Sequence, residues 1–173
     1  MQFEIKQTTE VLQQTPAVLG AMLRSKSGEW LNCRIQPETF TPIDVLGHLI
    51  FGEITDWIPR AQIILERGES RPFDPFDRFG HAQLIEGKPV GQLLDEFTKL
   101  RKRNLDTLAS WDLREDQLQR TGMHPELGRV TLEQLLATWA VHDLGHIAQI
   151  MRIMSHEYND AVGPWRQYLT ILH

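Results

Sequence analysis

The chain has 173 residues, of which 41% are hydrophobic and 24% are charged, and its formal net charge at pH 7 is −5. This length and composition are typical of a globular protein with one substantial core, so we expect residues 1–173 to form a single domain. The negative charge and the lack of a basic face argue against nucleic acid as a partner. The densest basic run, residues 99–103, is flanked by acidic residues and is interpreted as a solvated helix face.

The sequence gives no indication of a membrane or an oxidising compartment. No apolar run approaches the ~20 residues that cross a bilayer, and the first residues lack the apolar segment of a signal peptide. The single cysteine, Cys33, cannot form an internal disulfide and fits a reducing environment. We therefore expect a cytoplasmic protein. Cys33 lies in a connector without an adjacent base, so a passive thiol is favoured over a nucleophile.

The first predicted helix covers about residues 6–25 and carries apolar residues at helical spacing. Pro16 lies inside this segment. Because proline has no N–H and clashes with the preceding turn, we expect a kink or a break near Thr15.

The second predicted helix has a clear start. Thr41 is a good N-cap, Pro42 suits the first helical position and Asp44 suits the third. The apolar stripe that follows extends to about residue 67, where a glycine ends it. Pro59 falls inside the segment and should kink or split it.

A long connection, residues 68–88, separates the second helix from the third and is rich in proline, glycine and acidic residues. Long ordered loops often form pocket walls or lids. Two interpretations stay open for its aromatic and histidine side chains, which either line such a pocket or plug the end of the bundle. These side chains are Phe73, Phe76, Phe79 and His81.

Two further helices are predicted in the second half of the chain. One covers about residues 89–110, and the other begins at Thr131 with Gln134 in capping-box spacing and extends to about residue 154. The segment between them is polar and turn-rich, with no convincing strand, and contains His124 as a weak ligand candidate. A short closing helix is expected near residues 165–172. Four long amphipathic helices predict an all-α four-helix bundle.

The last long helix carries His142 and His146, four residues apart. At ~100° per residue both imidazoles project from one face, on or beside the apolar side. A divalent metal would offset the cost of burying them, and hydrogen bonds to a neighbouring helix would do the same, so both interpretations stay open. Asp143 lies on the apolar face and should need a partner, while Gln149 lies near the two histidines.

Residues of the second helix are less informative alone. His48 lies about 140° from Ile43, off the apolar stripe, so a surface or hydrogen-bonded histidine is favoured there. Glu53, five residues after His48, could accept a hydrogen bond from a ligand histidine. The preferred interpretation is a partly exposed carboxylate. Arg152 is interpreted as a surface arginine rather than an anion-binding group.

Three stretches together carry a family resemblance: TPIDVLGHLIFGEITDW in the second helix, TWAVHDLGHIAQIMR in the fourth, and the tail YNDAVGPWRQYL. In these stretches the chain resembles the DinB/YfiT-like superfamily of four-helix-bundle metalloproteins. The resemblance implies up-down-down-up topology, a long crossover between the second and third helices, and a homodimer. It also implies a metal site made of His48, His142 and His146, binding zinc or nickel, or iron as a third option.

The resemblance further implies an enzyme, a metal-dependent hydrolase or transferase of the thiol-dependent S-transferase type. Its substrate would be a small molecule, including a low-molecular-weight thiol such as bacillithiol, mycothiol or glutathione. Two alternatives remain open: a non-catalytic metal-binding or stress-response protein, and a metal-free dimeric interaction module.

Overall fold

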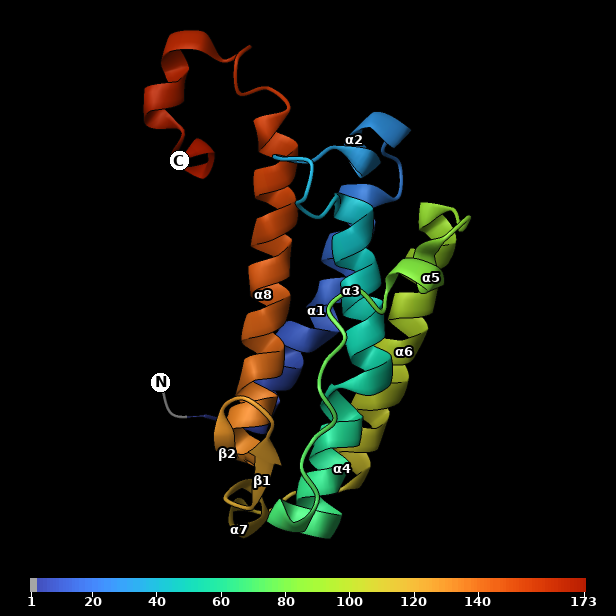
Figure 1. Cartoon of the computed structure of the whole chain (residues 1–173), viewed down its shortest axis with the longest axis vertical. Coiled ribbons are helices and arrows are strands. Elements are labelled where there is room, and N and C mark those ends of the chain that lie inside the picture. Colours follow the sequence, from blue (N-terminus) through green and yellow to red (C-terminus); the bar gives the residue numbers. More distant parts are fainter. Residues whose placement is uncertain (1–2) are drawn as a thin grey trace.

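The computed structural model describes residues 3–173 and contains four long helical rods (Figure 1). The rods are α1 (Ile5–Leu23), α3 (Pro42–Thr55) continued by α4 (Trp57–Arg67), α6 (Val90–Ser110) and α8 (Leu132–His156). In the view of Figure 1, α1 and α8 ascend while α3–α4 and α6 descend, which is the predicted up-down-down-up order. The four-helix bundle is confirmed.

Shorter elements join the rods. The helical ones are α2 (Gly28–Asn32), η1 (Gly68–Ser70), α5 (Ala82–Ile85), α7 (Glu115–Leu118), η2 (Gly163–Tyr168) and η3 (Thr170–Leu172). The strands are β1 (Thr121–His124) and β2 (Gly128–Thr131). Within residues 3–173, no helix combines the length and hydropathy that a membrane span requires.

The predicted N-cap at Thr41 and the predicted capping box at Thr131 are both confirmed, and Thr41 forms a capping box as well. At the start of α3, the Thr41 hydroxyl accepts a hydrogen bond from the Asp44 N–H at 3.1 Å, and the Asp44 carboxylate accepts one from the Thr41 N–H at 2.9 Å. At the start of α8, Thr131 and Gln134 make the same reciprocal pair. These pairs satisfy N–H groups that the first turn leaves without helical acceptors, so they fix where each helix begins.

α1 continues from Ile5 to Leu23 across Pro16, so of the kink or break expected near Thr15 the break is not found. A proline at position 16 leaves the Leu12 carbonyl without its helical donor. That carbonyl instead accepts a hydrogen bond from the guanidinium of Arg101 at 2.8 Å. The missing donor in α1 is thus replaced by a side chain from α6.

The second predicted helix is split, as Pro59 indicated. The division falls at Asp56, and Pro59 is the third residue of α4. Because Pro59 cannot donate to the carbonyl of Thr55, the hydrogen-bond ladder is interrupted one turn before the proline.

The expectation of no strand before α8 is wrong. β1 and β2 form an antiparallel hairpin in which His124 pairs with Gly128, whose φ is +74°. Neither strand has an alternating apolar pattern, so pairing depends on the surroundings. The Phe73 N–H donates to the Met123 carbonyl at 2.9 Å, and a Cβ on Gly122 would lie 2.7 Å from Ile64.

The crossover, residues 68–88, runs back along α3–α4, so that α6 starts at the same end of the bundle as α3 (Figure 1). Its length therefore produces the parallel pairing of these two rods. The short closing helix expected near residues 165–172 is present in 3-10 form and not as an α-helix. It consists of η2 and η3, and the chain turns back after α8 (Figure 1) so that η3, which contains the buried Leu172, packs against α8.

The apolar core forms two clusters, one toward each end of the bundle. Along each rod, the residues of the two clusters are separated by polar ones: Thr15 in α1, Glu53 in α3, Arg101 and Asn104 in α6, and Asp143 in α8, all buried. The middle level of the bundle is therefore polar, and the predicted histidines lie at this level.

Candidate metal centre

Three histidines from two rods converge at the middle of the bundle. The Nε2 atom of His142 lies 3.2 Å from Nε2 of His48 and 3.0 Å from Nε2 of His146. One ring nitrogen from each of the three lies within 4.8 Å of the other two. α8 supplies two of these rings because four residues make slightly more than one helical turn. α3 supplies the third, which is buried and not at the surface as its helical period had favoured.

The spacing of the nitrogen atoms suits a divalent ion. Zinc bonds to imidazole nitrogen at about 2.0–2.1 Å, so two ligands of a tetrahedral site lie about 3.3 Å apart. The two Nε2 separations of 3.2 and 3.0 Å are close to that value. The donor set of three imidazoles is one that zinc, nickel and iron accept.

Hydrogen bonding fixes the tautomer of His146. Its Nδ1 lies 2.7 Å from the side-chain oxygen of Gln149, which can only accept, so Nδ1 carries the proton. The Nε2 lone pair of His146 therefore faces the other two rings. The Nδ1 atoms of His48 and His142 are buried and have no partner among the described residues. Facing lone pairs repel each other, and a proton or a cation among the Nε2 atoms removes that repulsion.

The surroundings keep the rings neutral, which is the form that binds metal. Burial lowers the pKa of His142 to about 3, and the neighbouring His146 and His48 add to the shift. Burial also lowers the pKa of His48 to about 4, with contributions from His146, His81 and Arg78. The pKa of His146 is lowered by burial as well.

A buried ionic network lies beside the histidines. Arg101 donates to both oxygens of Asp143, at 2.6 and 3.1 Å, and to Glu53 at 2.8 Å. Glu53 also accepts from Asn104 at 3.0 Å and from the indole of Trp139 at 3.0 Å. Burial alone would lower the pKa of Arg101, but Glu53 and Asp143 raise it. Because Arg101 of α6 bonds to Glu53 of α3 and to Asp143 of α8, the network joins these three helices at the level of the cluster.

Two sequence interpretations are corrected here. Arg101 belongs to the run predicted to be a solvated face, yet it is 1% exposed. Glu53 was expected to be a partly exposed carboxylate or an acceptor for a ligand histidine. It is instead buried and forms an ion pair with Arg101. The need of Asp143 for a partner is confirmed, and the partner is again Arg101. The missed signal was the helical position of Arg101, one turn after the core residue Phe97.

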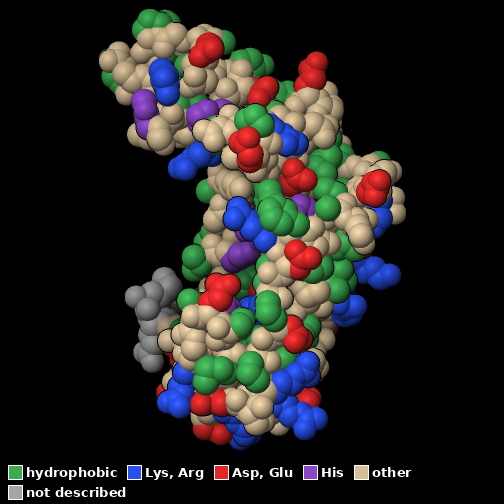
Figure 2. All heavy atoms as spheres, in the orientation of Figure 1, with side chains coloured by type: hydrophobic (Ala, Val, Ile, Leu, Met, Phe, Trp, Pro, Cys, Tyr) green, Lys and Arg blue, Asp and Glu red, His purple; other side chains and the backbone are tan. Residues whose placement is uncertain are grey.

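A pocket of about 390 Å³ opens beside the cluster and reaches His48 and His146. Among the aromatic and histidine residues of the crossover, Phe76 lines this pocket, while Phe73 is buried in the core and Phe79 is exposed. His81 is buried with its ring 5.0 Å from that of Phe40. Both interpretations therefore hold in part: Phe76 forms part of a pocket wall, whereas Phe73 and His81 pack inside the bundle. Histidine side chains come to the surface near the middle of the face shown in Figure 2.

The remaining candidates lie outside the cluster. Cys33 is buried, its thiol donates to the Trp30 carbonyl at 3.2 Å, and burial raises its pKa, all of which fit a passive thiol. Arg152 is exposed, as expected. His124 is not one of the three clustered rings but lines the pocket beside them.

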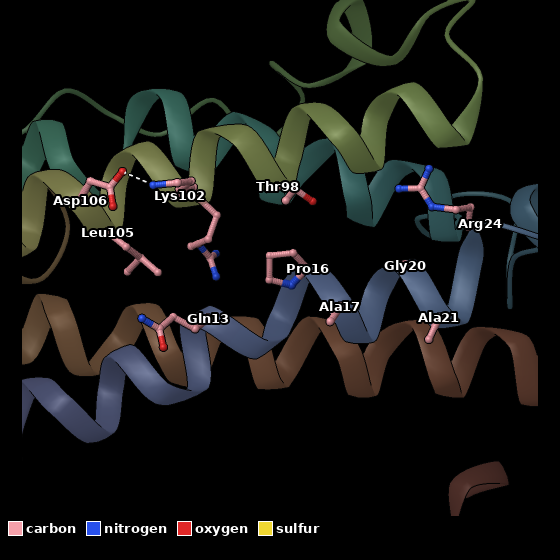
Figure 3. A pocket seen from close by; sticks show the side chains of 11 residues that line it. Gln13, Pro16, Ala17, Gly20, Ala21, Arg24, Thr98, Lys102, Leu105 and Asp106 are labelled. Atoms are coloured by element: carbon pink, nitrogen blue, oxygen red, sulfur yellow. Dashed lines mark hydrogen bonds and ion pairs between the residues drawn. The ribbon is translucent and has the colours of Figure 1, made fainter.

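A cavity of about 680 Å³ lies apart from the histidines, between α1 and α6 (Figure 3). Figure 3 shows that small residues of α1, Ala17 and Gly20 among them, leave this space against α6. Pro16 and the buried Arg101 also line it. None of the three clustered histidines lines this cavity.

Comparison with known proteins identifies the family. The sequence model of the DinB superfamily matches residues 8–150. The chain belongs to the DinB superfamily. No curated protein matches its sequence significantly.

The DinB fold is also evident in solved structures. YfiT from Bacillus subtilis, described as a probable metal-dependent hydrolase with an unusual four-helix bundle topology, superposes with a TM-score of 0.76 at 22% identity, over 88% of this chain and 87% of YfiT. The four-helix bundle protein TT2238 superposes with a TM-score of 0.57 at 18% identity, over 86% of this chain and 98% of TT2238. At these identities the likeness establishes the fold alone.

Proposed function

We propose that His48, His142 and His146 bind a divalent metal ion and that this DinB protein is a metal-dependent enzyme. The observation that carries the proposal is the convergence of three neutral imidazoles whose Nε2 atoms face one another. The pocket that opens on two of these rings supports catalysis over a purely structural ion. A closed site would offer a substrate no approach.

The proposed reaction is a hydrolysis or a thiol-dependent transfer. The description of YfiT as a probable metal-dependent hydrolase supports the first, and the resemblance to thiol-using members of the family supports the second. When bound, a zinc, nickel or iron ion would lower the pKa of a water or a thiol and so supply a nucleophile near neutral pH. Zinc and nickel are the preferred ions.

The protein's own residues would hold and orient this centre. Gln149 keeps the proton of His146 on Nδ1 and leaves its Nε2 free to bind. Phe76 and Phe40 lie in the pocket wall and would limit the access of water. Arg101 and Asp143 hold α8 against α6 next to the two rings of that helix. The expected homodimer stays a prediction.

Activity measurements test the proposal. Metal-free protein would be reloaded with zinc, nickel or iron(II) and assayed with glutathione and 1-chloro-2,4-dinitrobenzene, and separately with p-nitrophenyl esters. We expect at least one ion to give turnover that is lost in His142→Ala. Turnover that is equal without metal, or unchanged in His142→Ala, would contradict the proposal.

The alternative function is metal binding without catalysis. It would be supported by stoichiometric metal together with no turnover and no binding of thiols or anions to the metal-loaded protein. A folded protein that binds none of the three ions would instead favour the metal-free interaction module.

A further inference from the structure

The pocket beside the three histidines has walls from parts of the chain that are far apart in sequence. The crossover contributes Phe76 and Arg78, and the hairpin contributes His124 and Glu126. At about 390 Å³, the pocket has the volume of a site for a small molecule. Groups on these walls would contact the part of a ligand that lies away from the histidines.

Arg78 is a cation without a partner at this pocket. Its guanidinium carbon lies 5.6 Å from the centre of the Phe40 ring. Within residues 3–173, the Arg78 side chain makes no hydrogen bond and has no carboxylate within 4 Å, whereas Arg60 and Arg71 nearby pair with Asp56 and Asp74. A guanidinium that rests on an aromatic ring and has free N–H groups is well suited to bind a carboxylate or phosphate.

His124, from the hairpin, adds a neutral hydrogen-bond donor to the lining of this pocket. Its Nδ1 accepts from the N–H groups of Glu126 and Leu127, both at 3.1 Å. The proton of the neutral ring therefore lies on Nε2, which can only donate. The hairpin turn thus fixes the tautomer of a histidine that lines the pocket.

We propose that Arg78, assisted by His124, binds an anionic group of the substrate, a carboxylate or a phosphate, while the reacting group of the same molecule lies at the three histidines. This inference rests on the proposed function, because it assumes a ligand bound at that metal centre. Arg78 is then a specificity-determining residue. The substrate class is a small acid and not a neutral or cationic molecule.

Glu126 is the opposing charge in the pocket wall. Its carboxylate would repel an anionic ligand and attract a cationic one. Removing this charge should therefore strengthen anion binding, whereas removing the charge of Arg78 should weaken it. The two changes in one pocket thus have opposite expected signs.

Cobalt(II) absorption provides the test, because the visible bands of the ion report ligand exchange directly. Protein loaded with cobalt(II) would be titrated with 3-mercaptopropionate, which is an anion, and with 2-mercaptoethanol, which is neutral. The ratio of the two dissociation constants would be compared between variants, so that the intrinsic difference between the thiols cancels. We expect Arg78→Gln to shift this ratio about tenfold against 3-mercaptopropionate and to leave 2-mercaptoethanol binding unchanged.

Controls make each outcome decisive. Arg78→Lys should keep part of the preference, Glu126→Gln should increase it, and Arg71→Gln, in the same crossover but outside this pocket, should not change it. If cobalt binds normally and Arg78→Gln leaves the ratio unchanged, this inference is wrong while the metal centre stands. If no cobalt spectrum forms, the proposed function fails and the inference fails with it.

Discussion

At the scale of the residue, the protonation of the three histidines depends on their neighbours. The Gln149 side-chain oxygen accepts a hydrogen bond from the Nδ1–H of His146, which leaves the Nε2 lone pair directed toward the other rings. We predict that Gln149→Leu lowers zinc affinity by about 10–100-fold, because the ring loses the group that orients it. Competition with a chelating dye measures the affinity. An unchanged affinity would mean that the hydrogen bond does not orient the ring.

Arg101 is the cation that pairs with the two buried carboxylates, Glu53 and Asp143. Arg101→Met would leave Glu53 and Asp143 buried without their cation, and we predict a loss of about 3–5 kcal/mol in the free energy of unfolding. The neighbouring Lys102→Met is the matched control, since its ion pair with Asp106 is exposed and should contribute at most about 1 kcal/mol. Urea unfolding of the three proteins measures the difference. Equal losses in both variants would show that the network does not stabilise the fold.

The sequence predicts the histidines better than it predicts their surroundings. A spacing of four places His142 and His146 on one face whatever packs against them, so this pair is predictable from one helix. His48 lies off the apolar stripe of its helix, so helical period alone suggests that it is exposed. Arg101 lies one turn after the core residue Phe97, which favours burial, but its partner depends on which rods face it. The resemblance to the DinB superfamily indicated His48, but nothing indicated that Arg101 pairs with Asp143.

At the scale of the element, α8 has one face packed in the core and one face exposed to solvent. Leu136 is 1% exposed and Leu144 is 52% exposed. Truncating a buried leucine removes apolar contacts and leaves a cavity, so we predict that Leu136→Ala lowers the free energy of unfolding by about 2–5 kcal/mol. Leu144→Ala should change it by less than about 0.5 kcal/mol. Thermal and urea unfolding would check both, and similar effects would contradict the placement of α8.

Elements with strong local signals were predictable and those that depend on tertiary contacts were not. The starts of α3 and α8 follow from Thr41 and Thr131, whose side chains cap neighbouring N–H groups. The hairpin has no such local signal. Its strands pair because Phe73 from the crossover bonds to Met123 and because Gly122 fits against the core, and these contacts join segments far apart in sequence.

At the scale of the whole molecule, the neutral buried histidines make stability depend on pH. In metal-free protein the pKa of His48 is lowered to about 4, whereas the unfolded chain takes up its proton near pH 6.5. The stability that His48 contributes is therefore complete above pH 6.5 and is lost as pH falls toward 4. We predict that wild type loses up to about 1.4 kcal/mol more per pH unit than His48→Gln between pH 6 and pH 5.

The variant comparison is needed because other groups titrate in the same range. Burial raises the pKa of Asp56 to about 6, so this carboxyl acts in the opposite direction, but it is present in both proteins. Urea unfolding in the presence of EDTA at pH 7, 6 and 5 measures the two slopes. Identical slopes would mean that His48 is already protonated in the folded protein.

The metal content of the protein tests the central claim most directly. Untagged protein, purified without a nickel column, would be subjected to elemental analysis beside His48→Ala, His142→Ala and the control His156→Ala, a histidine of α8 outside the cluster. We predict about one divalent ion per chain in wild type and in His156→Ala, and almost none in the two cluster variants. Equal metal in all four proteins, or a folded wild type that binds no zinc, nickel or iron, would contradict the assignment of these histidines as a metal centre.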